Sequence, residues 1–382
     1  DRIANKRFPY LTIVNRGSNS PFGSVSQETL MESYIGADNL EWEVATKADL
    51  GIEGKLFDSR VDFVVDFFND QRSGIYQQRV QVPSYVGLTS MPFSNVGEMR
   101  SYGADGNISY TERLTKDLSL TLRGNFTYSK NDIDNWEEAN PKYPYQENAG
   151  YPNGVVRGYH ALGLFKDDYD IETSPVQTFG NYQPGDIKYA DINGDGKIDW
   201  TDKGFIGRTN RPELTYGLNL DFAWNGFDFN AQFTGGAMFD VSLTGTYYNG
   251  NDDNTIWTQT FKENANSPLF LVENAYSIYN PDGTFPRLTL GAPGHGGDNG
   301  LASTFWLRDG KYVRLKSAQL GYTFPNKWTK KINIEGLRIF VEGQNLFTID
   351  GLPEGIDPES PGVNNGYYPQ QRLVMGGISL TF

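Results

Sequence analysis

The chain has 382 residues and a formal net charge of −14, with 33 Lys and Arg against 47 Asp and Glu. This acidic balance argues against nucleic acid as a partner, because phosphate binding needs clustered Lys and Arg. No apolar run approaches the roughly 20 residues of a membrane-spanning helix, which excludes a helical membrane protein. The absence of cysteine excludes a disulfide framework and thiolate metal sites. The sequence opens at Asp1 without a signal peptide, so we expect a removed signal or a piece of a longer protein.

Strict alternation of apolar and polar residues is the strongest local pattern, and it starts near residue 40. In 40–56, Leu50 and Ile52 fall on one face of the expected strand, and Asp49 and Glu53 fall on the other. A period of two predicts a β-strand whose two faces meet different surroundings. High Tyr, Phe and Gly content, with scattered Asn, Asp and Thr, agrees with strands joined by turn-rich loops.

The pattern is clearest around residue 220. In 214–224 every even-numbered residue is large and apolar, and the odd-numbered residues are Thr, Gly, Asn, Asp and Ala. Asn225-Gly226 follows, which is the preferred pair for a two-residue type I′ hairpin turn, and 227–234 alternates again. Nine such spans, each about 9–11 residues or somewhat longer, suit strands that cross a bilayer at a tilt. The nine spans are 40–56, 61–69, 104–112, 118–128, 214–224, 227–234, 312–324, 337–347 and 372–382.

The connections between these spans alternate between short and long. The short ones, at 57–60, 113–117, 225–226 and 325–336, suit periplasmic turns, whereas long ones suit external loops. A soluble Greek-key sandwich has no reason to place every long loop on one side. The strand-like segment 155–165 would break this parity as a tenth span, so we expect it within a loop. The expected extracellular loops are 1–39, 70–103, 129–213, 235–311 and 348–371.

The last strand is the most specific single feature. Phe382, Leu380, Ile378 and Val374 share one face with Gly376. A terminal Phe that closes an alternating strand is the usual ending of outer-membrane barrels, although an ordinary edge strand could also end this way. Nine strands leave two open edges, and each unpaired backbone group in lipid costs several kcal/mol. The sequence therefore predicts an all-β fold, a transmembrane antiparallel β-barrel, of which this chain is the C-terminal portion.

Several stretches resemble the SusC family (SusC/RagA-like) of TonB-dependent outer-membrane transporters of Bacteroidetes. They cover most of residues 39–382 in the family's order. The stretches are NLEWEVATKADLGIEGKLFDSRVDF (39–63), NVGEMRSYGADGNISY (95–110), PGDIKYADINGDGKIDWTDKGFIGRTNRPELTYGLNLDFAWNGFDFNAQFTGG (184–236), LRDGKYVRLKSAQLGYTFP (307–325), LRIFVEGQNLFT (337–348) and PQQRLVMGGISLTF (369–382).

This resemblance implies a multi-pass barrel of 22 strands in the outer membrane of a Gram-negative bacterium. It also implies an N-terminal plug, a segment that contacts TonB and a SusD-like surface lipoprotein as partner. We expect the plug and the TonB segment to lie outside this chain. The implied function is active, TonB-dependent import of oligosaccharides or peptides.

Residues 191–202, DINGDGKIDWTD, nearly match the calcium-loop pattern D-x-[DN]-x-[DN]-G. Side-chain and backbone oxygens at this spacing could hold calcium in a structural role, as a brace for a long loop. The twelfth position carries Asp in place of the bidentate Glu, and no helical pattern flanks the loop. The alternative is a solvated turn rich in Asx residues. The candidate ligands are Asp191, Asn193, Asp195, Lys197, Asp199 and Asp202.

Aromatic residues in the expected loops could stack on sugar rings or peptide side chains. The alternative is loop packing or the aromatic girdle at the membrane interface. The candidate substrate-binding residues are Trp136, Tyr247, Tyr248, Trp257, Trp306 and Tyr367.

Catalysis finds little support in the sequence. The chain has two histidines, His160 and His295, and neither a G-x-S-x-G nor an H-E-x-x-H motif. Acidic residues are plentiful, but no glycosidase-like pair stands out. Charged residues on the non-lipid face, such as Arg123 and Asp221, suit a polar lumen. We therefore expect an importer without enzymatic activity. The alternatives are a secreted β-rich adhesin or carbohydrate-binding protein, and a surface glycosidase.

Overall fold

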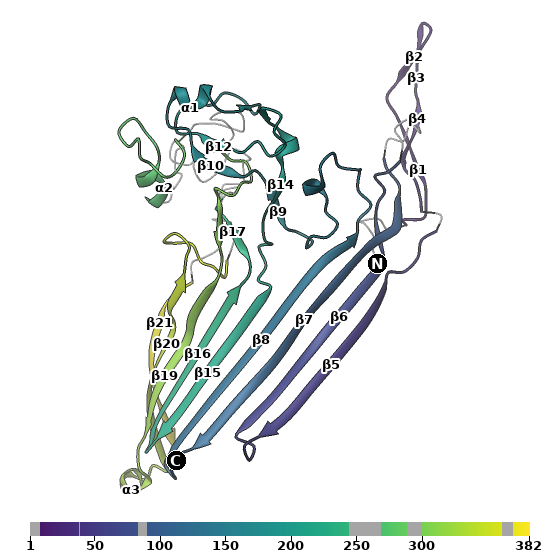
Figure 1. Cartoon of the computed structure of the whole chain (residues 1–382). Helices are drawn as coiled ribbons and strands as arrows, with labels where there is room; N and C mark the ends of the chain where they lie inside the picture. The colour runs from purple at the N-terminus through teal and green to yellow at the C-terminus, as the bar shows by residue number, and fades with distance from the viewer. Residues whose placement is uncertain (1–7, 38, 83–89, 244–268, 289–298, 361–369) are drawn as a thin grey trace. The chain divides into compact units, whose positions relative to one another are not determined.

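The computed structural model describes residues 8–37, 39–82, 90–243, 269–288, 299–360 and 370–382. Its main element is a nine-stranded sheet in which each strand neighbours the next sheet strand along the chain (Figure 1). Such a meander of long strands is what the nine alternating spans predict. In chain order the strands are β5 (Val44–Leu56), β6 (Val61–Gln78), β7 (Phe93–Arg113), β8 (Leu118–Asn135), β15 (Leu214–Trp224), β16 (Phe227–Ala237), β19 (Tyr312–Thr323), β20 (Gly336–Asp350) and β21 (Leu373–Thr381).

The chain divides into two compact units. The first comprises Asp1–Leu50, Phe67–Gly103 and Ser129–Asn153, and the second comprises Gly51–Asp66, Ala104–Tyr128 and Gly154–Phe382. The first unit contains a small antiparallel hairpin in which β1 pairs with β4 and β2 with β3. Its elements are β1 (Ile13–Arg16), β2 (Ser20–Phe22), β3 (Val25–Gln27), β4 (Leu30–Tyr34) and the 3-10 helix η2 (Pro144–Gln146).

Short elements of the second unit lie in the connections between the long strands. β9 pairs with β14 and β10 with β12, outside the nine-stranded sheet, so segment 155–165 belongs to a loop as predicted. The elements are β9 (Val156–Gly158), β10 (Ala161–Leu164), α1 (Asp168–Glu172), β11 (Val176–Gln177), β12 (Ile187–Tyr189), β13 (Lys197–Ile198), η3 (Trp200–Asp202), β14 (Gly204–Gly207), β17 (Asp240–Ser242), α2 (Leu269–Asn274), β18 (Leu307–Asp309), α3 (Asn326–Thr329) and η5 (Lys330–Ile332).

The β15–β16 hairpin confirms the predicted turn. Asn225 has a φ of 47° and Gly226 a φ of 90°, both in the left-handed region that a type I′ turn requires. A Cβ atom on Gly226 would lie 2.8 Å from the carbonyl oxygen of Thr323, so the neighbouring strand also demands glycine here. This turn fixes the register of the hairpin, in which Trp224 lies opposite Phe227 and Leu218 opposite Phe233.

Strand pairing aligns the apolar residues into rows on one face of the sheet. Leu218 pairs with Phe233, which pairs with Leu315, which pairs with Phe347. Many large side chains of this face remain exposed; Val341, for example, is 57% exposed and Ile378 68%, whereas Leu315, between Phe233 and Phe347 in the row, is 9% exposed. In water such a contiguous apolar surface would favour aggregation, whereas lipid is its natural solvent. The face is therefore built for the hydrocarbon core of a bilayer.

Several strands are longer than the alternation predicts. β6 continues to Gln78 rather than ending at residue 69, and β7 starts at Phe93 rather than at 104, so the connection between them is 79–92. The added residues of β6 begin with Asp70-Gln71-Arg72, which are polar on both faces. Strand pairing needs only backbone groups, so it persists where both faces meet water and the alternation disappears. Alternation thus finds the lipid-facing part of each strand and misses the rest.

Among the described residues, no helix is both long and apolar enough to cross a bilayer.

We predict that Leu218→Arg prevents assembly of the intact receptor in the outer membrane, whereas Asn219→Arg is tolerated. Leu218 lies on the apolar face, and a charge at the bilayer midplane costs about 2–4 kcal/mol. Asn219 is the adjacent residue of the same strand and points to the polar face, so it is the matched control. The measurement is the fraction of each variant that shows the gel migration of a folded barrel in isolated outer membranes. Equal assembly of the two variants would refute the two-faced sheet.

Candidate functional site

The polar face of the sheet carries a row of paired charges. Arg123 of β8 approaches Asp221 of β15 with 3.5 Å between Nη1 and Oδ2. Asn230 of β16 donates from Nδ2 to Oδ1 of the same carboxylate at 2.5 Å. Three adjacent strands therefore contribute one residue each to a hydrogen-bonded row. The sequence prediction that Arg123 and Asp221 share the non-lipid face is confirmed by their register, in which Arg123 pairs with Asn219 and Asp221 with Thr121.

The row continues across the next two strands. Gln319 of β19 donates to Glu342 of β20 at 2.9 Å, and Gln344 donates to the other oxygen of Glu342 at 2.9 Å. Arg338 donates to Gln319 at 2.6 Å and forms a bidentate ion pair with Asp228. We call the whole set the polar ladder: Arg123, Asp221, Asp228, Asn230, Gln319, Arg338, Glu342 and Gln344. Each charged group of the polar ladder has an ion-pair or hydrogen-bond partner on another strand of the sheet. This face therefore suits a water-filled lumen and weak, reversible contacts with a solute.

A second polar cluster ties the connection between β20 and β21 to strand β19. Arg314 is only 3% exposed and donates from Nη2 to Asp357 Oδ1 and from Nη1 to Glu359 Oε2, each at 2.6 Å. Its Nε donates to the Thr348 hydroxyl at 2.9 Å, and Lys316 pairs with Glu359 at 3.2 Å. A buried guanidinium is tolerated only when paired, and here two carboxylates and two cations balance. We call this group the Arg314 anchor.

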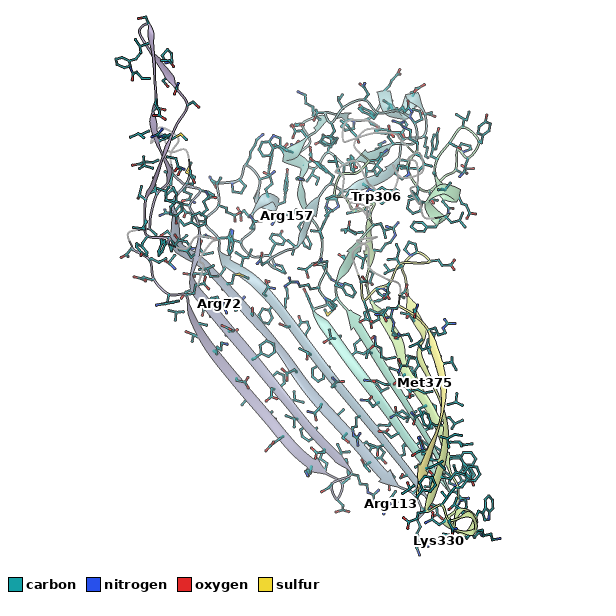
Figure 2. All side chains as sticks on the ribbon, turned by 180° about the vertical axis from the view of Figure 1, so that it is seen from behind. Arg72, Arg113, Arg157, Trp306, Lys330 and Met375 are labelled. Atoms are coloured by element: carbon teal, nitrogen blue, oxygen red, sulfur yellow. The ribbon has the colours of Figure 1, made fainter. Side chains whose placement is uncertain are left out.

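The loops of the second unit form a small folded domain with its own core, which we call the loop domain. Its buried cluster comes from segments more than 100 residues apart in sequence, including Tyr159, Ile187, Leu271 and Trp306. Figure 2 shows Trp306 among these loops. It is fully buried, and its indole N–H donates to the Asn299 carbonyl oxygen at 2.7 Å. Long connections that pack around a shared core are ordered rather than coil-like.

A buried carboxylate joins three parts of the loop domain. Asp186 is fully buried and accepts from Arg287 Nε at 2.7 Å, from Asn299 Nδ2 at 2.9 Å and from the Gln183 backbone N–H at 2.9 Å. Asn299 in turn accepts from the Ile187 backbone N–H at 2.8 Å. The charge of Asp186 is thus paired, and the carboxylate links segments that are 101 and 113 residues away.

At the edge of the loop domain, Lys188 donates to Asp170 at 2.8 Å and holds helix α1 against β12. This hydrogen bond holds the pKa of Asp170 below its ordinary value.

A pocket of about 600 Å³ opens beside Arg287 in the loop domain. Its wall includes Tyr276 and Ile278 from the turn that follows α2, and Val272 and Glu273 from α2 itself. None of these residues was singled out from the sequence. The available signal was the run Tyr-Ser-Ile-Tyr followed by Asn-Pro-Asp-Gly at 276–283, in which exposed aromatic residues meet a turn sequence.

The residues of the expected calcium loop lie together in a tight turn. Asp191 accepts from the backbone N–H groups of Gly194 and Gly196 at 2.7 and 2.8 Å. Asn193 and Asp195 each accept from the N–H two residues further on. Gly194 and Gly196 have φ values of 74° and 84°, which other residues rarely adopt. The turn therefore needs its Asx and Gly residues for its own backbone geometry.

The remaining expected ligands have further roles in the same turn. Asp199 and Asp202 form a capping box around η3, and fully buried Asp202 also accepts from the Ile192 backbone N–H at 2.8 Å. Lys197 begins β13, which pairs with β11. In the described part of the chain, no three His, Asp or Glu side chains converge as metal ligands.

The expected substrate-binding aromatics are placed in different environments. Trp306 lies in the core of the loop domain, where its ring offers no face to a solute. Its large apolar ring is buried because it fills the core around which the loops pack. Trp136 is half-buried just after β8. Tyr247, Tyr248, Trp257 and Tyr367, like His295, lie outside the described residues.

Taken together, a sheet with one apolar and one polar face, short turns at one end and a folded loop domain defines a membrane β-barrel of the outer-membrane class. Comparison with known proteins agrees. Residues 13–346 match the family described as TonB dependent receptor-like, beta-barrel. The chain belongs to this family of outer-membrane receptors, which are not enzymes, and the expectation of a SusC-type receptor barrel is confirmed.

Two curated relatives illustrate the relationship. TonB-dependent receptor P3 of Formosa agariphila is 27% identical over 373 residues, which cover 90% of this chain and 35% of that protein. TonB-dependent receptor SusC of Bacteroides thetaiotaomicron is 24% identical over 98% of this chain and 35% of its own length. The chain therefore spans about a third of these relatives.

Solved structures show the same fold. The RagAB peptide importer in its open-open state matches 100% of this chain and 38% of the solved chain, with a TM-score of 0.67 and 22% identity. A structure of the RagAB peptide transporter matches 99% of this chain and 39% of the solved chain, with a TM-score of 0.64 and 23% identity. At this identity the likeness establishes the fold alone.

We predict that Arg314→Gln in the intact receptor releases the connection 351–360 from the sheet. Asp357 and Glu359 would then repel each other without their shared cation, and breaking a buried pair costs about 3–5 kcal/mol. Limited proteolysis should cut this connection faster in the variant. The control is Lys311→Gln, which removes a cation from the exposed pair with Asp309 and should leave cleavage unchanged. Identical cleavage of Arg314→Gln and wild type would contradict the anchor.

Proposed function

We propose that the complete protein imports oligosaccharides or peptides across the outer membrane by a TonB-dependent mechanism. The observation that carries this proposal is the polar ladder, which lies on the opposite face of the sheet from the lipid-facing rows. A secreted adhesin would have no use for an exposed apolar face that spans nine strands. Membership of the TonB dependent receptor-like family, and the name of a solved structural neighbour as a peptide importer, support the same proposal.

The proposal includes parts of the protein beyond this chain. The two edge strands of the sheet, β5 and β21, need partners in lipid, and a barrel of 22 strands with a plug inside would supply them. A segment that contacts TonB would couple import to an energy source. The relatives are about three times as long as this chain, which leaves room for these parts.

A SusD-like surface lipoprotein is the proposed partner of the extracellular loops. The folded loop domain offers a defined surface, and the homologue named SusC and the neighbour named RagAB favour a partnered receptor. The contacts are proposed for the regions 70–103, where the connection between β6 and β7 is 79–92, and 235–311. Purification of the intact receptor in mild detergent should bring down a lipoprotein, and a clean single-component preparation would count against the partner.

A structural calcium ion is proposed for the turn 191–202. Asp191 uses two lone pairs on backbone N–H groups and Asp195 uses one, and a carboxylate has about four, so oxygen lone pairs remain for a cation. The ligands would come from Asp191, Asn193, Asp195, Lys197, Asp199 and Asp202, and the ion would neutralise the local excess of acidic groups.

We predict that millimolar calcium slows proteolysis within residues 184–210 of the wild-type receptor, because an ion that binds only the folded state stabilises it. Asp191→Asn with Asp195→Asn should abolish this protection. Asp282→Asn, which removes one exposed carboxylate elsewhere in the loop domain, is the control. Protection that survives the double substitution, or none in wild type, would reject the site.

For import itself, deletion of residues 244–268 should abolish growth on one oligosaccharide or peptide source while the receptor still reaches the surface. Asn230→Ala, which removes one donor among many in the polar ladder, should change growth little because each such hydrogen bond contributes only about 0.5–1.5 kcal/mol. Growth on a panel of sources, with surface expression measured in parallel, tests both expectations. Normal growth of receptor-deleted cells on every source would overturn the importer.

A further inference from the structure

The pocket beside Arg287 has a rigid frame. The guanidinium donates to buried Asp186 through Nε and Nη2, at 2.7 and 3.1 Å. With the Gln183 amide oxygen turned toward it, Nη1 donates there at 3.0 Å. The Arg287 backbone N–H donates to the Gly185 carbonyl oxygen at 3.0 Å, and Tyr276 packs against Gly185, where an added Cβ would lie 2.1 Å from the ring. The pocket wall is therefore held in place before any ligand arrives, which lowers the cost of binding.

The charge of the pocket favours a neutral ligand. Asp186 balances Arg287, so Glu273 carries the remaining charge among the lining residues. An anionic ligand would be repelled by this carboxylate and by the acidic protein as a whole. Arg287 has five N–H groups, and the contacts to Asp186 and Gln183 account for three of them. Spare donors on Arg287 and an acceptor on Glu273 together suit hydroxyl groups.

The rim of the pocket carries exposed aromatic and aliphatic surface. Ile278, which lines the pocket, is 82% exposed. Tyr279 does not line the pocket itself but lies between the lining residues Ile278 and Asn280 in sequence, and it is 92% exposed. Their turn is held by reciprocal backbone hydrogen bonds between Ser277 and Asn280 at 3.0 and 3.1 Å. An exposed aromatic ring on a backbone that is held in place offers a stacking platform beside the pocket, because a Tyr side chain has few rotatable bonds to order on binding.

The backbone of this turn argues against a peptide as the ligand. One recurring way in which an extended peptide binds is to add a strand to a free edge. Here the Tyr276 N–H donates to the Phe285 carbonyl oxygen at 2.8 Å, and the Phe285 N–H donates to the Asn274 carbonyl oxygen at 3.0 Å. The reciprocal pair between Ser277 and Asn280 occupies the next backbone groups. The wall thus offers side chains rather than a strand edge.

We propose that this pocket is a capture site for a neutral oligosaccharide. One sugar ring stacks on Tyr279 beside the pocket, and the hydroxyls of the next unit donate to Glu273 and accept from Arg287 inside it. A volume of about 600 Å³ is within the usual range for small-ligand sites. As a step in uptake the site rests on the proposed import function, but binding itself does not depend on import.

The test is calorimetric titration of the intact receptor in detergent with neutral tetrasaccharides of glucose, xylose, mannose and galactose. Tyr279→Ala and Glu273→Gln should each weaken binding of at least one of them about fivefold to tenfold, as expected for loss of one aromatic contact or one hydrogen bond. Tyr169→Ala is the matched control, because Tyr169 is also exposed but belongs to helix α1, which contributes no residue to the pocket, whereas the neighbours of Tyr279 line it. Unchanged thermal unfolding of the three variants shows that the loop domain is intact.

Affinity that is the same in Tyr279→Ala, Glu273→Gln and wild type would overturn the capture site, as would the absence of any binding by wild type. Binding of neutral peptides that is lost in Tyr279→Ala, without binding of sugars, would overturn the assigned ligand class. Growth of receptor-deleted cells separates failure of the capture site from failure of the import function. Receptor-deleted cells that still grow on every source refute the importer, whatever the titration shows.

Discussion

The constraint on which the rest of the structure depends is the backbone hydrogen bond in a medium without water. Every N–H and C=O group that enters the hydrocarbon core must find a partner within the protein, because lipid offers none. The nine-stranded sheet meets this demand through its ladders, in which β15, for example, is paired along its whole length with β8 and with β16. The same demand makes β5 and β21 incomplete by themselves, since each has a single neighbour in the sheet.

Once the strands are paired, side chains decide what each face meets. Period-two geometry sends neighbouring residues to opposite faces, so one register sets both surfaces at once. The row from Leu218 to Phe347 faces lipid, and the polar ladder faces the other way. Two carboxylates of the ladder, Asp221 and Asp228, form ion pairs with its two arginines. The third, Glu342, accepts hydrogen bonds from Gln319 and Gln344, so every charged group of this surface has a polar partner. In the loops, the Arg314 anchor and buried Asp186 hold separate segments together, as strand pairing holds the sheet together.

The sequence predicted the sheet well because its signal is local. Alternation and the Asn225-Gly226 turn placed all nine strands, and the limits of β15 agree with the prediction. The prediction of strand ends failed where both faces of a strand meet water, as in β6 beyond residue 69, because apolar and polar residues no longer alternate there. It also could not foresee the loop domain, whose contacts join residues more than 100 positions apart. Trp306 illustrates this, since a loop position suggested a surface role and the fold buried it. The pocket residues Glu273 and Tyr276 likewise become neighbours of Arg287 only in three dimensions.

The central claim is that one face of the sheet meets lipid and the other meets water. The chain contains no cysteine, so a single cysteine introduced at each position from 215 to 223 of β15 is the one thiol within residues 1–382 that a label can modify. Any cysteine elsewhere in the intact receptor is first replaced by serine. In the intact receptor in outer membranes, a membrane-impermeant maleimide should modify the odd-numbered positions. A fluorophore attached at even-numbered positions should instead be quenched by lipid-borne spin labels. A two-residue period in both measurements, with opposite phase, is the predicted result. Uniform labelling along the strand, or quenching without a period, would contradict the account.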